Sequence, residues 1–158
     1  MNTTATVRRA EPGDVAGIAG LLGELGYPGQ AAAVALRLER VLASRAAAFI
    51  ADLGGSAVGL CTIHLFDVIH EDAAVAMLSV LIVTADVRRA GVGRRLVEEA
   101  EQWARTSGAG RIVVATGLSR KAAHSFYEAL GYEHNARRYI KRMVQGGEAA
   151  SAGGLTTR

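Results

Sequence analysis

The chain of 158 residues has little of several residue types, and each shortage excludes a class of protein. Its one cysteine, Cys61, allows neither a disulfide nor a cysteine-rich zinc site, and we expect no metal cofactor. Aromatic residues make up only 5% of the chain, so alanine, valine and leucine must fill the core. The longest apolar stretch, Ala73 to Val83, is too short to cross a bilayer, and the first residues lack the apolar core of a signal peptide. We therefore expect a cytoplasmic protein without a membrane partner.

What the chain does contain is a globular composition and an excess of arginine. Half of the residues are hydrophobic, and the length suits one domain with a proper core, which we expect over residues 1–145. Residues 146–158 are small and polar, and we expect a disordered tail there. The net charge is +3 and nearly all the positive charge is arginine, which fits either an anionic partner or a solvated surface.

The apolar pattern predicts an α+β fold with a mixed, mostly antiparallel central sheet. Apolar residues recur every three or four positions in some segments and form alternating or continuous short runs in others. The first kind predicts helices at about 15–25, 30–44, 96–104 and 119–130. The second kind predicts strands at about 4–9, 47–52, 56–66, 73–83, 111–116 and 132–144.

The stretch VRRAGVGRRL, residues 87–96, packs two glycines and four arginines between a predicted strand and helix. The first backbone N–H groups of a helix have no partner inside it, and glycine lets an anion approach them closely. The combination favours a pyrophosphate. A P-loop is excluded because Arg94 follows Gly93 where lysine is required, and a dinucleotide fingerprint is disfavoured by Leu96 in place of a third glycine. A tight turn with a solvated arginine face remains the alternative reading of this stretch alone.

A second motif favours the pyrophosphate-binding interpretation over the tight turn. Residues 123–132, AHSFYEALGY, resemble the AHxFYExLGY segment of the GCN5-related N-acetyltransferases, the GNAT superfamily. Arg88, Gly91 and Gly93 likewise stand at the fixed positions of that superfamily's R-x-x-G-x-G acetyl-CoA loop. The resemblance extends over about residues 4–144. More narrowly, LGYP at 25–28 and RYIK at 138–141 resemble the branch of aminoglycoside and aminoalkylphosphonate acetyltransferases.

The resemblance implies a sheet of six to seven strands flanked by about four helices, and acetyl-CoA as the co-substrate. It implies that the pantetheine arm runs along the strand before the loop and that the loop's main-chain N–H groups bind the pyrophosphate. It also implies that Tyr127 is the general acid that protonates the departing sulfur, a role that suits a phenol with a pKa of about 10. The implied acetyl-CoA-binding residues are Ile82, Val83, Arg88, Arg89, Ala90, Gly91, Val92, Gly93 and Arg94.

A general base and an acceptor are harder to identify. Ser79 stands where many relatives have a glutamate, and Arg120 stands where many have a cofactor-binding asparagine. Base candidates are His64, His70, Glu71 and Asp72.

The function that the sequence favours is N-acetylation of a small-molecule amine. The resemblance also implies a homodimer, because dimers are common in this superfamily. A non-catalytic acyl-CoA sensor remains open. A nucleic-acid-binding module is disfavoured, because no stacking aromatics accompany the arginines, and we expect no nucleic-acid partner.

Overall fold

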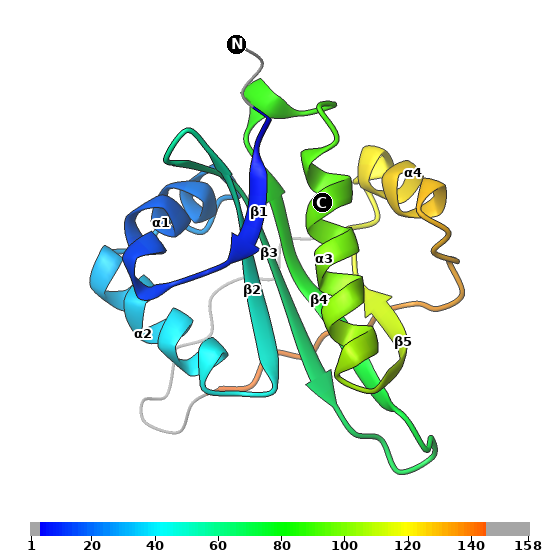
Figure 1. The fold of residues 1–158 in the computed structure, drawn as a ribbon. Helices are drawn as coiled ribbons and strands as arrows, with labels where there is room; N and C mark the ends of the chain where they lie inside the picture. The colour runs from blue at the N-terminus through cyan, green and yellow to red at the C-terminus, as the bar shows by residue number, and fades with distance from the viewer. Residues whose placement is uncertain (1–3, 145–158) are drawn as a thin grey trace, which may run out of the picture.

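The computed structural model describes residues 4–144, which form one sheet with helices packed against it (Figure 1). The chain order is strand, two helices, three strands, helix, strand, helix, as the apolar pattern predicts up to the fourth helix. The strands are β1 (Thr6–Arg9), β2 (Ala46–Leu53), β3 (Ser56–Phe66), β4 (Ala74–Val83) and β5 (Ala109–Val114). The α-helices are α1 (Val15–Glu24), α2 (Ala31–Leu42), α3 (Val92–Thr106) and α4 (Lys121–Ala129).

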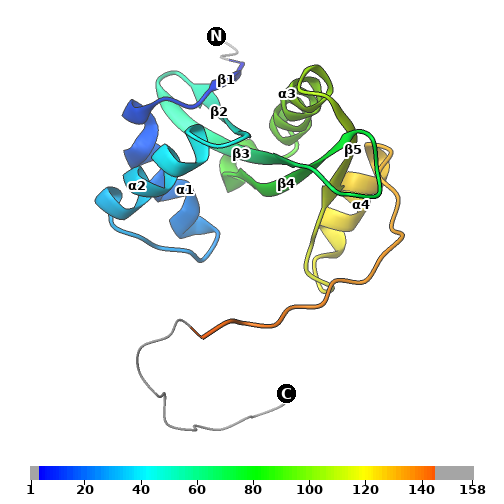
Figure 2. The same cartoon turned by 90° about the horizontal axis from the view of Figure 1, so that it is seen from below.

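The sheet is mixed, as predicted, and its strands follow one another in the order β1-β2-β3-β4-β5. β1 to β4 pair antiparallel, while β5 lies parallel to β4 because α3 carries the chain back between them. α1 and α2 cover one face of the sheet, α3 covers the other, and α4 lies beside β5 (Figure 2). Among the described residues, no helix is both long and apolar enough to span a membrane.

A bulge in β4 divides the core between the two faces. Thr62 pairs with Val80 while its neighbour Ile63 pairs with Leu78, so Ser79 is an extra residue on β4. Before the bulge, the even-numbered residues of β4, such as Leu78, pack in the cluster beneath α3. After it, the even-numbered Ile82 packs in the cluster beneath α1 and α2. The bulge therefore exchanges the faces to which β4 points its alternate side chains, at the middle of the sheet.

The prediction of six to seven strands is wrong, because the described sheet has five. Residues 132–144, predicted to be the last strand, run extended and unpaired after α4, with the side chains of residues 133–144 exposed. A strand needs an edge within reach, and its own alternating pattern carries no information about whether one exists. The chain instead turns away at Tyr132, whose hydroxyl donates to Glu101 Oε1 at 2.9 Å. The predicted tail, residues 146–158, lies outside the described residues.

Candidate active site

The sheet opens where β4 and β5 separate. Their pairing ends at Leu78 and Val114, yet β4 continues to Val83. Along residues 79–83 one edge of β4 pairs with β3 and the other pairs with no strand of the described sheet. That free edge presents backbone N–H and C=O groups to any extended ligand laid beside it.

A cleft of about 140 Å³ fills this opening. Its lining combines the separated ends of β4 and β5, the end of α1 and one face of α4. Most of the lining residues are apolar, and polar and apolar atoms contribute similar shares of its surface. Within residues 4–144 no carboxylate lines it. The lining residues are Leu25, Leu78, Ser79, Val80, Leu81, Val114, Ala115, Thr116, Arg120, Ala123, Phe126 and Tyr127. Of the two β4 residues expected beside the pantetheine arm, neither Ile82 nor Val83 lines the cleft itself. Both continue the same free edge toward the glycine loop.

The glycine loop forms the N-terminus of α3, as predicted. Gly91 is the residue before the helix and has φ +76°, a left-handed conformation that glycine adopts without steric cost. The first intrahelical bond runs from Arg95 N–H to Gly91 O at 3.1 Å. The N–H groups of Val92, Gly93 and Arg94 therefore have no acceptor within the helix, and they form the donor set that a phosphate would need.

The loop and the second motif meet across the end of β4. A Cβ built on Gly93 would lie 3.5 Å from Phe126 Cζ on α4 and 3.6 Å from Val83 Cγ2 on β4. These distances place the start of α3 in contact range of both α4 and the end of β4. Two motifs that are about 30 residues apart in the sequence thus border one region of the surface.

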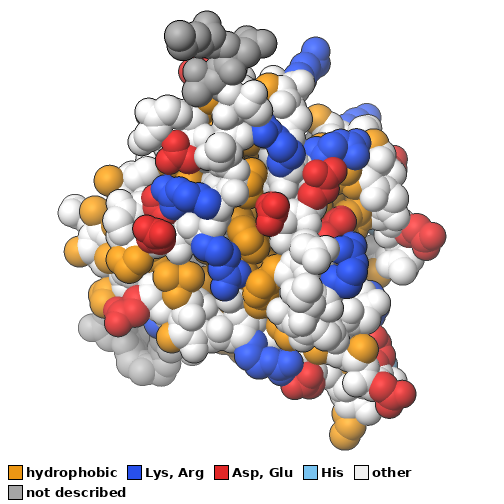
Figure 3. All heavy atoms as spheres, viewed as in Figure 1, with side chains coloured by type: hydrophobic (Ala, Val, Ile, Leu, Met, Phe, Trp, Pro, Cys, Tyr) orange, Lys and Arg blue, Asp and Glu red, His pale blue; other side chains and the backbone are white. Residues whose placement is uncertain are grey.

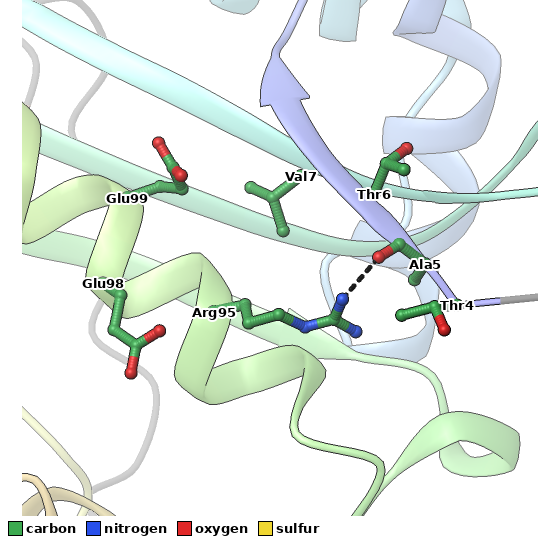
Figure 4. A pocket seen from close by; sticks show the side chains of 7 residues that line it. All are labelled: Thr4, Ala5, Thr6, Val7, Arg95, Glu98 and Glu99. Atoms are coloured by element: carbon green, nitrogen blue, oxygen red, sulfur yellow. Dashed lines mark hydrogen bonds between the residues drawn. The ribbon is translucent and has the colours of Figure 1, made fainter.

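The four arginines of this stretch have different roles. Arg88 Nε donates to Val83 O at 3.1 Å and so ties the loop to the end of β4. Arg89 has φ +68°, the one positive φ of a non-glycine residue within residues 4–144. That conformation costs about 1 to 2 kcal/mol in a residue with a Cβ. Arg94 is exposed. Arg95 turns away, and its Nη1 donates to Ala5 O at 2.6 Å just before β1 (Figure 4).

We expect Arg95 to stabilise the fold rather than to bind an anion. Replacing it with methionine keeps the apolar stem and removes the bond to Ala5 O, so the free energy of unfolding should fall by about 1 to 2 kcal/mol. Denaturant unfolding measures this loss, and the control is Arg94→Met on the exposed neighbour. If Arg95→Met left stability intact and weakened acetyl-CoA binding more than Arg94→Met did, the assignment would be wrong.

Tyr127 lies against the cleft with its ring packed between two others. Its side chain is buried, and its ring makes edge-to-face contacts with Phe126 at 5.1 Å and with Tyr132 at 5.5 Å between centroids. Burial and, to a smaller extent, the nearby Cys61 raise the pKa of the Tyr127 phenol to about 12, and the Arg120 guanidinium opposes the shift. The phenol is therefore neutral at ordinary pH and is available as a hydrogen-bond donor.

Cys61 has no signature of a nucleophile. It is fully buried in β3, and burial raises the pKa of its thiol to about 12. A thiol without accessible thiolate is inert.

None of the four base candidates lines the cleft. Glu71 lies beyond β3 and forms an ion pair with Arg111, with Oε1 and Nη2 2.7 Å apart, which lowers the pKa of the Glu71 carboxyl. His70 Nε2 lies 3.4 Å from the same carboxylate. His64 is half-buried in β3 opposite Met77. Proton removal from the acceptor therefore has no assigned side chain among these residues.

Two polar residues of the cleft had no assigned role in the sequence. Ser79, the bulge residue, places its Oγ 2.7 Å from Thr62 Oγ1. Arg120 lies at the start of α4 and reaches the same cleft as Tyr127. The sequence contained one indication for each residue. Both stand at positions where the family that the chain resembles usually has a functional side chain.

Comparisons with known proteins identify the family to which the sequence is similar. The family model described as the acetyltransferase (GNAT) family matches residues 16–132. An aminoalkylphosphonate N-acetyltransferase of Salmonella typhimurium is 29% identical over 89 residues, 56% of this chain and 58% of that protein. An aminoglycoside N(6')-acetyltransferase of Acinetobacter genomosp. 13 is 30% identical over 75 residues, 47% of this chain and 51% of that protein. The matches thus span little more than half the length of either relative.

Among solved structures, an aminoglycoside N-acetyltransferase in complex with CoA superposes with a TM-score of 0.80 at 22% identity. The superposition covers 90% of this chain and 97% of that one, and at this identity it establishes the fold.

Proposed function

Because this chain belongs to the GNAT family of acetyltransferases, we propose that it transfers an acetyl group from acetyl-CoA to the primary amine of a small molecule. The transfer would be direct, with both substrates bound at once. The observation that carries the proposal is the opening between β4 and β5, where Tyr127 lines the cleft and the free edge of β4 leads from the cleft toward the donor-rich start of α3. The named activities of the two relatives, on an aminoalkylphosphonate and on an aminoglycoside, agree with an amine acceptor.

The described residues fit acetyl-CoA at three points. The N–H groups of residues 92–94 suit the pyrophosphate, and Gly91 and Gly93 keep side chains away from that approach. The edge of β4 that runs to Ile82 and Val83 suits the amides of the pantetheine arm, which can pair with it as a strand would, with Val83 O also accepting from Arg88 Nε. Arg88, Arg89, Ala90 and Arg94 complete the loop, with Arg88 acting through its bond to Val83 O.

Tyr127 is the residue that would assist departure of the sulfur. Its phenol is neutral, the residue lines the cleft, and it belongs to the motif that resembles the family's. A donor at this position would give a proton, or a hydrogen bond, to the sulfur as the C–S bond breaks. The chain otherwise acts by orienting amine and thioester for attack, which in favourable cases supplies most of the catalysis.

The proposal is tested by thiol release from acetyl-CoA in the presence of a panel of primary amines. The panel should include aminoalkylphosphonates, aminoglycosides and amino-acid amides, with mass spectrometry of the acetylated product. We expect thiol release that depends on at least one amine. Tight acetyl-CoA binding without turnover of any amine would favour the alternative, a non-catalytic acyl-CoA sensor.

A nucleic-acid-binding module would instead give salt-dependent DNA binding. On the face in Figure 3, arginine and lysine side chains are interspersed with carboxylates rather than gathered in one basic stripe. That distribution supports a small-molecule partner.

We also propose that the protein is a homodimer. Four large apolar side chains after α4 are exposed, Tyr139 by 87%, Ile140 by 65%, Met143 by 76% and Val144 by 84%. The segment that carries them runs away from the sheet (Figure 2). Burial of such a patch against a second chain would stabilise association. We expect sedimentation to give a dimer, and a variant with Ile140→Asp and Met143→Asp to give a folded monomer. A monomeric wild-type chain would contradict this proposal.

A further inference from the structure

Within the described chain, Arg120 is the one cationic residue that lines the cleft, and Tyr127 lines the same cleft. Arg120 is the residue before α4, while Ala123 and Tyr127 are four residues apart within the helix and both line the cleft. Helical side chains lean toward the N-terminus, which tilts the Tyr127 ring toward Ala123 and the start of α4. Ala123 contributes only a methyl group to the lining between them.

The loop before α4 holds the stem of Arg120. The Arg120 N–H donates to Gly117 O at 3.0 Å, and His124 Nε2 lies 3.0 Å from the same carbonyl oxygen. The stem of Arg120 crosses Gly117 closely enough that a Cβ there would lie 3.5 Å from Arg120 Cγ. Within residues 4–144 no carboxylate forms an ion pair with Arg120. Its charge is thus available to a ligand in the cleft.

The surroundings of Tyr127 contain no other cation among the described residues. Cys61 of β3 faces it and is neutral, and the Tyr132 ring beside it bonds to Glu101 of α3 through its hydroxyl. Arg120 is the one neighbour that lowers the pKa of the Tyr127 phenol, against the effect of burial. Since Arg120 and Tyr127 also line the same cleft, the guanidinium is placed to act on an anion that forms there.

We propose that Arg120 stabilises the negative charge that leaves with the sulfur of CoA, a role that rests on the proposed function. In the transfer, the amine nitrogen forms a bond to the acetyl carbon, the C–S bond breaks and its electron pair goes to sulfur. The extra proton on the nitrogen passes to water. The Tyr127 hydroxyl donates to the resulting thiolate, and Arg120 supplies the countercharge.

The ordinary acidities of the two groups indicate where the charge lies. A thiol has a pKa of about 8.5. The pKa of Tyr127 is about 12, so full proton transfer from phenol to thiolate is unfavourable. The charge then stays mainly on sulfur, and a nearby cation contributes more than it would beside a neutral thiol.

Titration of bound CoA tests this without an acceptor amine. The ultraviolet absorbance of the thiolate reports the pKa of CoA in complex with the protein, and desulfo-CoA reports binding that does not involve sulfur. We expect the wild-type protein to lower the pKa of the bound thiol by about one unit, which corresponds to about tenfold tighter binding of the thiolate than of the thiol. Arg120→Gln should abolish most of this shift, and Arg120→Lys, which keeps the charge, should retain most of it. The control is Arg94→Gln, which should weaken CoA and desulfo-CoA alike and leave the thiol pKa of bound CoA unchanged.

Three results would overturn the inference. One is a wild-type complex whose CoA thiol titrates as it does in free solution. Another is a shift that survives Arg120→Gln. The third is an Arg120→Gln variant that weakens CoA and desulfo-CoA by one factor at every pH, because Arg120 would then bind phosphate. Failure of the wild-type protein to bind CoA at all would refute the proposed function as well, so the two failures are distinguishable.

Discussion

Replacing Tyr127 with phenylalanine should lower kcat by about 100-fold and leave the affinity for acetyl-CoA within a factor of two or three. The substitution removes one oxygen and keeps the ring, so the edge-to-face contacts with Phe126 and Tyr132 persist. The lost group is the donor that we propose for the departing sulfur. The measurement is steady-state thiol release with the best amine of the panel, together with calorimetric titration of acetyl-CoA.

Tyr132→Phe is the matched control. It removes the same atom from the neighbouring ring, whose hydroxyl bonds to Glu101 and does not line the cleft. We expect this control to lower stability and to leave kcat unchanged. A Tyr127→Phe enzyme that kept kcat within threefold of the wild type would remove Tyr127 from the chemistry.

The pH dependence of the rate provides a second readout of the same role. The folded pKa of Tyr127 is raised to about 12, so the phenol stays protonated throughout the range in which the enzyme can be assayed. We therefore expect that any loss of wild-type activity between pH 8 and about 10 also occurs in the Tyr127→Phe variant. A basic limb in that range that depends on Tyr127 would show a phenol far more acidic than its burial allows.

Local chemistry explains why much of the fold could be predicted from the sequence. The strand Ser56–Phe66 has the predicted limits because Gly54 and Gly55, with φ of +61° and +87°, make a hairpin turn that few other residues could make. α3 was predictable from its single apolar stripe, whose residues are buried apart from the half-buried Trp103. Such signals are contained within a few neighbouring residues.

Features that depend on distant partners were not predictable. The bulge at Ser79 falls inside a continuous apolar run, in which no alternation exists to be interrupted. The segment 132–144 has strand-like residues but no partner edge in the described chain, so the predicted strand is absent. Both outcomes depend on pairing between segments, which a local pattern does not encode.

In the candidate site, too, some features could be predicted from the local sequence and others depend on distant partners. Gly91 was predictable because a left-handed turn before a helix requires a residue without a Cβ. The four arginines around it look alike in the sequence, yet Arg95 bonds to Ala5, 90 positions away. Arg95 directly precedes the buried Leu96 and lies three residues after the buried Val92, which places it at the border of the apolar stripe of α3. That position was the one local sign of its structural role.

Replacing Gly91 with valine should weaken acetyl-CoA binding by about tenfold or more, whereas Arg94→Ala should weaken it only a few-fold. A Cβ at Gly91 would meet no atom within 4 Å, so the cost comes from the backbone rather than from a clash. A side chain held at φ +76° costs about 1 to 2 kcal/mol, and the loop can relieve that cost by turning its N–H groups away from the ligand. Since 1.4 kcal/mol corresponds to a factor of ten, the strain alone accounts for the expected loss.

Gly108→Val is the matched control for this effect. Gly108 also has a positive φ, +87°, and also has open space around it, but it follows the opposite end of α3. Both glycine variants should lose similar stability in thermal unfolding, and only Gly91→Val should lose affinity in a titration with acetyl-CoA. If Arg94→Ala lost more affinity than Gly91→Val, side-chain charge rather than main-chain donors would hold the pyrophosphate. The helix start would then have no special part in binding.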